Sequence, residues 1–197
     1  MSGWETYVRK VEPYVPGEQP KRKVIKLNTN ENPYPPSPRV QKVLDGFDAE
    51  ELRLYPDPEA ADLIEAIALE KGLSKDQIFV GVGSDDVLAM SFLTFFGSDK
   101  PILFPDITYS FYDVWAELFY IHYVQIPLQK DFRICIEDYK RENGGIVIPN
   151  PNAPTGIAES LDAIEEILKT NPDSVVIIDE AYVDFGTKSA LALLPKY

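Results

Sequence analysis

Two acidic residues follow directly after a strongly apolar run near the end of this sequence. Residues 175–178 are four consecutive β-branched residues, a pattern typical of a strand buried on both faces, and Asp179 and Glu180 come next. The carboxyl ends of parallel strands form the edge where α/β proteins bind ligands, so an acid there could meet a cationic group. The alternative is that the two acids only begin the following loop.

Two further junctions between a predicted strand and a helix carry residues that could hold a ligand. In the stretch GVGSDD (81–86), two glycines let the backbone approach a ligand, and the N–H groups of Ser84, Asp85 and Asp86 would form an anion site suited to a phosphate. An ordinary helix cap explains the same residues. Tyr109, where the next loop enters a helix, could lie over a planar ligand, or could be a core or surface tyrosine.

The stretch NPNAPTG (150–156) is the most specific of these junctions. Two X-Pro pairs, short amide side chains and a closing Thr-Gly make a stiff turn that can present an amide donor. Because ordered loops at the ligand edge tend to be sites, we favour a functional role over a plain turn.

The elements that would position these junctions alternate regularly. An amphipathic helix is expected at 59–71, capped by Gly72. Strands are then expected at 78–80, 101–104, 123–127, 144–149 and 174–182, and helices at 86–96, 111–119 and 160–170. This alternation predicts an α/β fold with a largely parallel sheet and helices on both faces. The earlier part is different: prolines concentrate at 11–20 and 28–38 around a short strand expected at 23–27, which indicates an extended arm.

Composition limits the possible partners. With 19 basic and 32 acidic residues the net charge is −13, which argues against a nucleic-acid groove or an anionic membrane surface, so a phosphate would have to be held locally. The single Cys135 excludes an internal disulfide framework, and with the single His122 it leaves no zinc cluster; a carboxylate site for a hard metal stays open, and no metal is assigned. Without a signal-peptide core or a membrane span, we expect a cytoplasmic protein.

Six motifs, in order, resemble the histidinol-phosphate aminotransferase branch of the class II aminotransferases, which are fold-type I pyridoxal-phosphate enzymes. They are LNTNENP (27–33), LYPDP (54–58), GVGSDD (81–86), TYSFY (108–112), NPNAPTG (150–156) and DEAYVDF (179–185). The resemblance covers essentially the whole chain, and the choice of branch depends mainly on LNTNENP and the Tyr-Pro pair.

The resemblance implies pyridoxal 5'-phosphate as cofactor and a role for several residues. Asp179 would pair with the pyridine nitrogen and make the ring an electron sink. Tyr182 would hydrogen-bond the phenolic oxygen, and Tyr109 would stack on the ring. Ser84 and Asp85 would meet the phosphate with their backbone N–H groups.

Further implications concern assembly and substrate. Tyr55 resembles the tyrosine that reaches the cofactor phosphate of the neighbouring subunit, which implies a homodimer. Tyr14 and Asn30 are expected to bind substrate. Residues 1–45 would form an N-terminal arm and part of a small domain, and 46–197 the first part of the large cofactor-binding domain.

The sequence departs from the family pattern at two places. Ala153 stands where the family has an asparagine before Pro-Thr-Gly, and either Asn152 fills that role after a local shift or the bond is missing. The lysine that forms the Schiff base lies in the family on a later strand, and this sequence ends at Tyr197 without a matching Ser-Lys motif. We therefore expect these residues alone to be inactive.

The resemblance implies an enzyme that, when complete, exchanges an amino group between two small molecules. Histidinol phosphate and 2-oxoglutarate would give imidazole acetol phosphate and glutamate. A threonine-phosphate decarboxylase or an aromatic aminotransferase would share the same cofactor residues. An alternative of another class is a non-catalytic truncated fragment.

Overall fold

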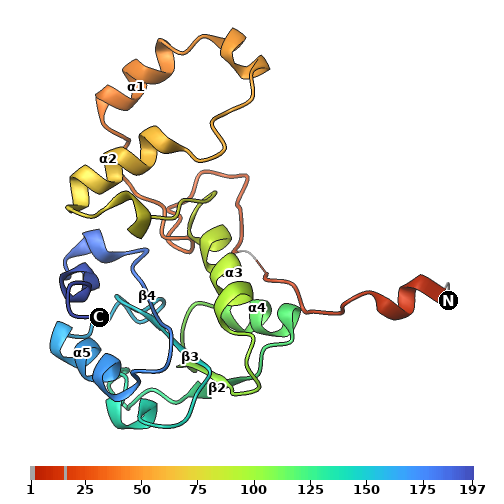
Figure 1. Ribbon diagram of the computed structural model, residues 1–197. Coiled ribbons are helices and arrows are strands. Elements are labelled where there is room, and N and C mark those ends of the chain that lie inside the picture. Colours follow the sequence, from red (N-terminus) through yellow and green to blue (C-terminus); the bar gives the residue numbers. More distant parts are fainter. Residues whose placement is uncertain (1–2, 16) are drawn as a thin grey trace. The chain divides into compact units, whose positions relative to one another are not determined.

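The computed structural model describes residues 3–15 and 17–197, and the chain divides into two compact units. One unit holds Met1–Tyr14 and Gly81–Tyr197, and the other holds Val15–Val80. Figure 1 labels the α-helices of both units and most of the strands, all of which belong to the larger unit. The borders of these units differ from the boundary expected after residue 45, and that functional division stays a prediction.

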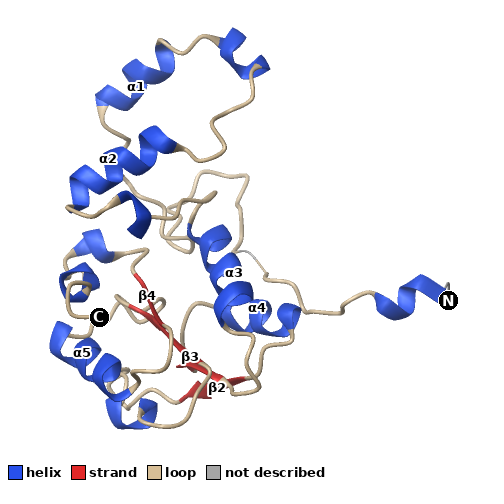
Figure 2. Ribbon diagram, viewed as in Figure 1, coloured by secondary structure: helices blue, strands red, loops and turns tan. Residues whose placement is uncertain are grey.

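A four-stranded parallel sheet forms the centre of the larger unit (Figure 2). Its strands, in the spatial order β2-β1-β3-β4, are β1 (Ile102–Pro105), β2 (Tyr123–Ile126), β3 (Gly145–Pro149) and β4 (Val176–Asp179). Pro149 is in register with Asp179, so the carboxyl ends of β3 and β4 lie side by side. The predicted parallel α/β architecture is confirmed.

Helices cover both faces of this sheet, as expected from the alternation of strands and helices. Helices α3 (Ser84–Phe95) and α4 (Tyr112–Phe119) pack against the face that carries Ile102, Phe104 and Val147. Helix α5 (Leu161–Thr170) packs against the opposite face. Neighbouring strand residues point to opposite faces, which is why the strands contribute to both cores.

Aromatic side chains fill the core beneath α3 and α4. Phe92 is completely buried, and its ring makes edge contacts with Phe96 at 5.1 Å and with Trp115 at 5.5 Å between centroids. Full burial of each such side chain contributes about 1.5–3 kcal/mol. On the other face, α5 buries Ile164 and Ile167, three residues apart on one helical face. The two cores therefore lie on opposite faces of the sheet.

Strand β4 differs from its expected environment. Its four residues are only partly buried, and Val175 just before it is 42% exposed, although the run was expected to be buried on both faces. The reason is position: β4 is the edge strand and pairs with β3 alone among the strands that the structure describes. An edge strand lacks the neighbour that would cover its far side.

The smaller unit contains helices α1 (Pro38–Asp45) and α2 (Ala61–Lys71). Gly72 ends α2 with a left-handed φ of 67°, and its N–H bonds the Ala68 carbonyl, as the expected cap requires. The strands expected at 23–27 and 78–80 were wrong, because neither segment pairs with a strand in the structure. A strand needs a ladder partner, and Ile25 is instead 90% exposed.

Short 3₁₀ segments connect the regular elements. They are Gly3–Tyr7, Ala49–Arg53, Lys75–Gln77, Ile136–Tyr139, Val183–Phe185 and Ala190–Leu193. Within the larger unit, Arg9 of the N-terminal segment donates a hydrogen bond to the Leu118 carbonyl and lies 4.7 Å from the centre of the Tyr120 ring. This cation–π contact ties the start of the chain to the end of α4.

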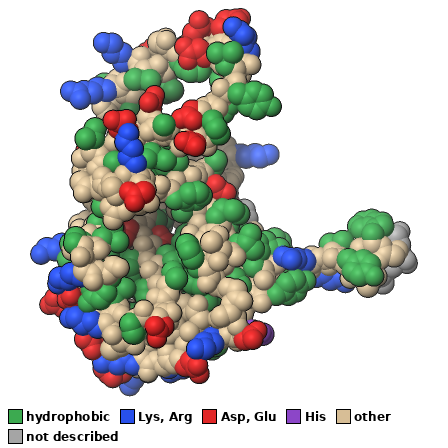
Figure 3. Space-filling model, viewed as in Figure 1, with side chains coloured by type: hydrophobic (Ala, Val, Ile, Leu, Met, Phe, Trp, Pro, Cys, Tyr) green, Lys and Arg blue, Asp and Glu red, His purple; other side chains and the backbone are tan. Residues whose placement is uncertain are grey.

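The surface is mixed in charge. On the face shown in Figure 3, acidic and basic side chains are interspersed with apolar ones. None of the helices in 3–15 and 17–197 is both long and apolar enough to cross a membrane.

Candidate active site

A cavity of about 170 Å³ lies at the carboxyl edge of the sheet in the larger unit. It is lined by the start of α3, the loop after β1, the loop after β3 and the end of β4. Its lining residues are Ser84, Asp85, Tyr109, Pro149, Pro151, Ala153, Asp179, Ala181 and Tyr182. The cavity therefore brings together five residues that the sequence singled out in the segments 81–86, 108–112 and 179–185. They are Ser84, Asp85, Tyr109, Asp179 and Tyr182.

Asp179 is the central acid of this cavity. Its Oδ2 accepts a hydrogen bond of 2.6 Å from the hydroxyl of Tyr112, and its Oδ1 accepts one of 3.1 Å from the backbone N–H of Ala181. Its own carbonyl accepts from the N–H of Asn150 at 2.8 Å, which continues the pairing of β3 with β4. Each carboxylate oxygen has a second lone pair, so Asp179 can also accept from a cationic N–H group in the cavity.

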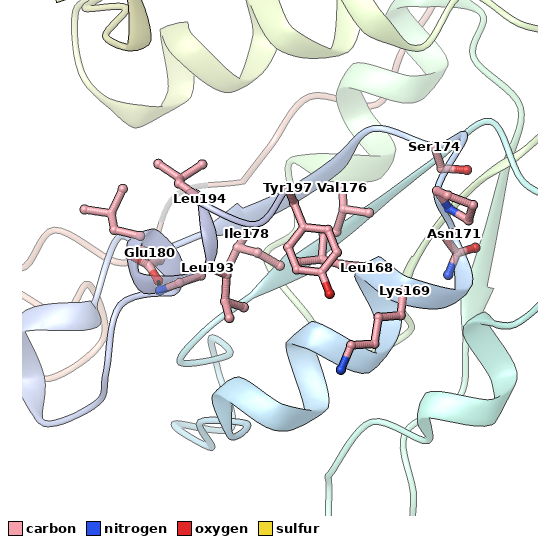
Figure 4. A pocket seen from close by; sticks show the side chains of 13 residues that line it. Leu168, Lys169, Asn171, Ser174, Val176, Ile178, Glu180, Leu193, Leu194 and Tyr197 are labelled. Carbon is pink, nitrogen blue, oxygen red and sulfur yellow. Dashed lines mark hydrogen bonds between the residues drawn. The ribbon is translucent and has the colours of Figure 1, made fainter. Parts of the chain in front are cut away.

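Glu180, the other acid of the pair, serves a different purpose. It lines a separate hollow of about 710 Å³ along β4, with Leu168 of α5 and apolar residues of the segment 190–194 (Figure 4). Its carboxylate accepts hydrogen bonds from the Ser189 hydroxyl at 2.6 Å and from the Ala190 N–H at 2.5 Å. Glu180 thus anchors the segment after β4, and the ligand-edge role falls to Asp179 alone.

Tyr112 is a residue that the sequence reasoning missed. It is the first residue of α4, it is completely buried, and its ring contacts those of Phe92 and Phe104 at centroid distances of 6.0 and 5.7 Å. Burial raises the pKa of the Tyr112 phenol well above its ordinary value, and the charge and hydrogen bond of Asp179 raise it further. A buried tyrosine hydroxyl needs a polar partner, and that need was the available clue.

Tyr109 is held by a second acid. Its hydroxyl donates to Oδ1 of Asp85 at 2.8 Å, and its ring makes an edge contact with Tyr112 at 5.7 Å and 84°. Burial raises the pKa of the Tyr109 phenol, with further contributions from the hydrogen bond and charge of Asp85. Asp85 therefore contributes a side-chain contact here, in addition to the backbone N–H that the sequence suggested.

The start of α3 has the backbone geometry that an anion site requires. Gly83 precedes the helix with φ 85°, a conformation that favours glycine. A Cβ at Gly81 would lie 2.7 Å from Oδ2 of Asp86, which accepts from the Val82 N–H at 3.0 Å, so a side chain at Gly81 would disturb this turn. The first N–H groups of a helix have no carbonyl in a preceding turn and can bind an anion.

The loop 150–156 is ordered by its asparagines. Asn150 is completely buried, and its side chain bonds both the N–H and the carbonyl of Glu159, at 2.8 and 3.4 Å. The Nδ2 of Asn152 donates to the Ile107 carbonyl at 2.9 Å, so this amide joins the loop after β1. Ala153, not Asn152, is among the residues that line the cavity. A cofactor contact by Asn152 stays a prediction.

Tyr14, Asn30 and Tyr55, also singled out from the sequence, are not among the residues that line this cavity. Tyr14 stacks on Phe111 at 4.5 Å, and Phe111 in turn packs on Tyr109 at 5.5 Å, which places Tyr14 two rings from the cavity. Tyr55 and Asn30 belong to the smaller unit. The Tyr55 side chain is completely exposed, and Asn30 is exposed with a left-handed φ of 52°.

Comparison with known proteins identifies the family. The sequence profile described as "Aminotransferase class I and II" matches residues 22–196. The chain belongs to this family. The aminotransferase chain is 58% identical over 201 residues to the histidinol-phosphate aminotransferase of Acinetobacter baylyi, covering 100% of this chain and 56% of that protein. It is 56% identical over 195 residues to that of Lactococcus lactis subsp. cremoris, covering 98% of this chain and 55% of that protein.

Solved structures share the fold of this aminotransferase chain. The histidinol-phosphate aminotransferase of Sinorhizobium meliloti, in complex with pyridoxal-5'-phosphate, matches with a TM-score of 0.74 at 24% identity, over 82% of this chain and 45% of that one. An L-threonine-O-3-phosphate decarboxylase from Porphyromonas gingivalis matches with a TM-score of 0.62 at 20% identity, over 78% of this chain and 47% of that one. The chain spans about half the length of the curated relatives it matches.

Proposed function

We propose that the complete protein carrying this chain is a pyridoxal-phosphate-dependent aminotransferase that acts on histidinol phosphate and 2-oxoglutarate. The observation that carries the proposal is the cavity in which the Asp179 carboxylate, the Tyr109 ring and the start of α3 converge. The choice of substrates follows the names of relatives that share more than half of the aligned residues.

The lining residues fit pyridoxal phosphate. Asp179 is a half-buried carboxylate held by two donors, which suits a protonated ring nitrogen. The backbone N–H groups of Ser84 and Asp85 at the start of α3 suit a phosphate in a chain whose overall charge repels it. Tyr109 offers an aromatic ring, and Tyr182 a hydroxyl beyond the end of β4.

Within the proposed reaction the chain's own residues bind and orient. Pyridoxal phosphate, when bound, supplies an electron sink for the carbanion formed at the substrate carbon. Asp179 would keep the proton on the ring nitrogen, and Tyr182 would donate to the phenolic oxygen. Tyr109, whose hydroxyl is held by Asp85, would lie against the ring and exclude water from that side. The family resemblance implies that the Schiff-base lysine would lie in the part of the relatives that this chain does not span.

The proposal extends to assembly and substrate binding. A homodimer would place the exposed Tyr55 at the cofactor phosphate of the partner. Tyr14, close to Tyr109 through Phe111, and Asn30 would contact substrate. A chain with the single free Cys135 suits a reducing compartment such as the cytoplasm.

Substrate preference tests the reaction. The complete protein is assayed for glutamate formation from 2-oxoglutarate with histidinol phosphate, phenylalanine or O-phosphothreonine as amino donor. We expect kcat/KM for histidinol phosphate to exceed that for the other two at least about 100-fold. Release of CO₂ from O-phosphothreonine would instead identify a decarboxylase, and a preference for phenylalanine an aromatic aminotransferase.

A matched pair of variants tests the site. Asp179→Ala should lower turnover of the complete protein by orders of magnitude while the circular dichroism spectrum is unchanged. Asp173→Ala is the control, because Asp173 is exposed in the turn before β4, at the opposite end of the same strand. Wild-type turnover in Asp179→Ala would refute the assignment of the cavity.

A further inference from the structure

The contact between Tyr112 and Asp179 links the α4 core to the cavity across 67 positions of sequence. A carboxylate can only accept hydrogen bonds, so the Tyr112 hydroxyl is the donor. Because the Tyr112 side chain has no exposed surface and its ring is enclosed by aromatic neighbours, the hydroxyl cannot leave Asp179 without repacking the core.

Asp179 is the last residue of β4 and is only partly buried among the residues that the structure describes. Its carboxylate is held at one oxygen by Tyr112 and at the other by the Ala181 N–H. Because each carboxylate oxygen accepts from a different donor, the plane of the Asp179 carboxylate is set before any ligand arrives. Of these two donors, only the Tyr112 hydroxyl is anchored in the core.

We propose that Tyr112 is a positioning residue, whose hydroxyl holds the Asp179 carboxylate in the orientation that meets the charged ring nitrogen of the cofactor. The inference rests on the proposed function, because it assumes an aromatic cation in the cavity. Tyr112 need not touch the cofactor, since its effect passes through Asp179. Pre-organising a charged group in this way strengthens its interaction with a bound ligand.

Tyr139 provides a matched control within the same chain. It is also completely buried, but in the core on the opposite face of the sheet, where its hydroxyl has no hydrogen-bond partner among the described residues. Tyr139→Phe and Tyr112→Phe each remove one buried oxygen atom. They differ in that only Tyr112→Phe removes a contact with the cavity.

The test measures cofactor affinity and does not depend on turnover. The complete protein, freed of cofactor, is titrated with pyridoxamine 5'-phosphate and with the analogue in which C–H replaces the ring nitrogen. We expect Tyr112→Phe to weaken binding of pyridoxamine 5'-phosphate about tenfold, and Tyr139→Phe to change it less than about twofold. The loss in Tyr112→Phe should disappear for the nitrogen-free analogue, which cannot use Asp179.

A double-mutant cycle tests whether the effect of Tyr112 on cofactor binding passes through Asp179. In the Asp179→Ala background, Tyr112→Phe should have no further effect on the affinity for pyridoxamine 5'-phosphate. An unchanged affinity in Tyr112→Phe, or the same loss with both ligands or in both backgrounds, would overturn the positioning role. If the wild-type protein does not prefer pyridoxamine 5'-phosphate to its nitrogen-free analogue, the pairing of Asp179 with the ring fails, and the proposed function loses its support as well.

A measurement on the wild-type protein covers the case in which Tyr112→Phe does not fold. A crystal structure with pyridoxamine 5'-phosphate bound should keep the Tyr112 hydroxyl within hydrogen-bond distance of Oδ2 of Asp179 while the ring nitrogen contacts the same carboxylate. A Tyr112 hydroxyl that has turned away from Asp179 in that complex would overturn the inference.

Discussion

The hydroxyl of Tyr109 donates a hydrogen bond of 2.8 Å to Oδ1 of Asp85, and the two residues lie on one wall of the cavity. The contact ties the loop after β1 to the first turn of α3. With the bond between Tyr112 and Asp179, it gives the site two phenol–carboxylate pairs. In both pairs the phenol has a raised pKa and keeps its proton where an exposed tyrosine would lose it.

These raised pKa values predict a loss of stability at alkaline pH. Tyr109, Tyr112 and Tyr139 all have a raised pKa, in each case first because of burial, whereas the ordinary value is 10.0. Above that pH the unfolded chain releases protons that the folded chain retains, so the free energy of unfolding falls as pH rises. Each such tyrosine contributes a slope of up to about 1.4 kcal/mol per pH unit.

Urea unfolding of the complete protein between about pH 9 and pH 11 checks this slope. The contribution of the three buried tyrosines to the free energy of unfolding should be fully present below about pH 10 and should decline above it. Tyr112→Phe and Tyr139→Phe should each reduce the slope, because phenylalanine has no proton to release. A free energy of unfolding that stays constant over this range would contradict the prediction.

Hybrid dimers test the role of Tyr55. We expect a symmetric dimer in which Tyr55 of each subunit reaches the other's cofactor phosphate. Tyr55→Ala and Asp179→Ala should each be nearly inactive alone, because each damages both sites. After subunit exchange, half of the dimers are hybrids and one site in each is intact, so about one quarter of wild-type activity should return.

The same mixture distinguishes this arrangement from one in which Tyr55 contacts the cofactor of its own subunit. If Tyr55 acts within its own subunit, no site in a hybrid is intact and activity does not return. Mixing Tyr55→Ala with itself through the same exchange procedure is the control. A fully active monomer in analytical ultracentrifugation would also contradict the dimer.

Asn152 and Tyr182 should differ in their effects on cofactor binding. Because the Asn152 amide bonds the Ile107 carbonyl, Asn152→Ala should lower the free energy of unfolding by about 1–2 kcal/mol. Tyr182→Phe should weaken binding of pyridoxamine 5'-phosphate more than Asn152→Ala does, because Tyr182 lines the cavity. The reverse order would show that Asn152 replaces the family's asparagine at the phenolic oxygen.

The lysines after β4 should not form a covalent bond with the cofactor. Lys196 is 2.9 Å from Oε1 of Glu165, and the hydrogen bond and charge of Glu165 raise its pKa, so the amine stays protonated and a poor nucleophile. Lys188 is exposed and is not among the residues that line the cavity. Residues 1–197, mixed with pyridoxal phosphate and reduced with borohydride, should therefore show no specific pyridoxyl adduct by peptide mass.

The complete protein is the positive control for this reduction, because it should carry the adduct on a lysine outside the present sequence. A stoichiometric adduct on Lys188 would instead make the 197-residue chain a candidate enzyme in its own right.

Local patterns in the sequence determined much of the fold and of the cavity. Helical spacing over residues 59–71 and the Gly72 cap predicted α2, and the apolar runs before the loops predicted β1, β3 and β4. Once parallel strands are predicted, their carboxyl ends must share one edge, so residues at those ends must converge. This is why Tyr109 and Asp179 could be grouped without coordinates, whereas the strand expected before Ser84 does not form.

The tertiary structure decided the features that depend on partners distant in sequence. The segments 23–27 and 78–80 have strand composition but no ladder partner, and β4, at the edge of the four described strands, is only half-buried. Asn152 bonds Ile107, and the Tyr112 hydroxyl meets Asp179 rather than solvent. A hydrogen bond or a strand pair needs two groups that the whole fold brings together. Periodicity and composition describe each group by itself and do not say which partner it will meet.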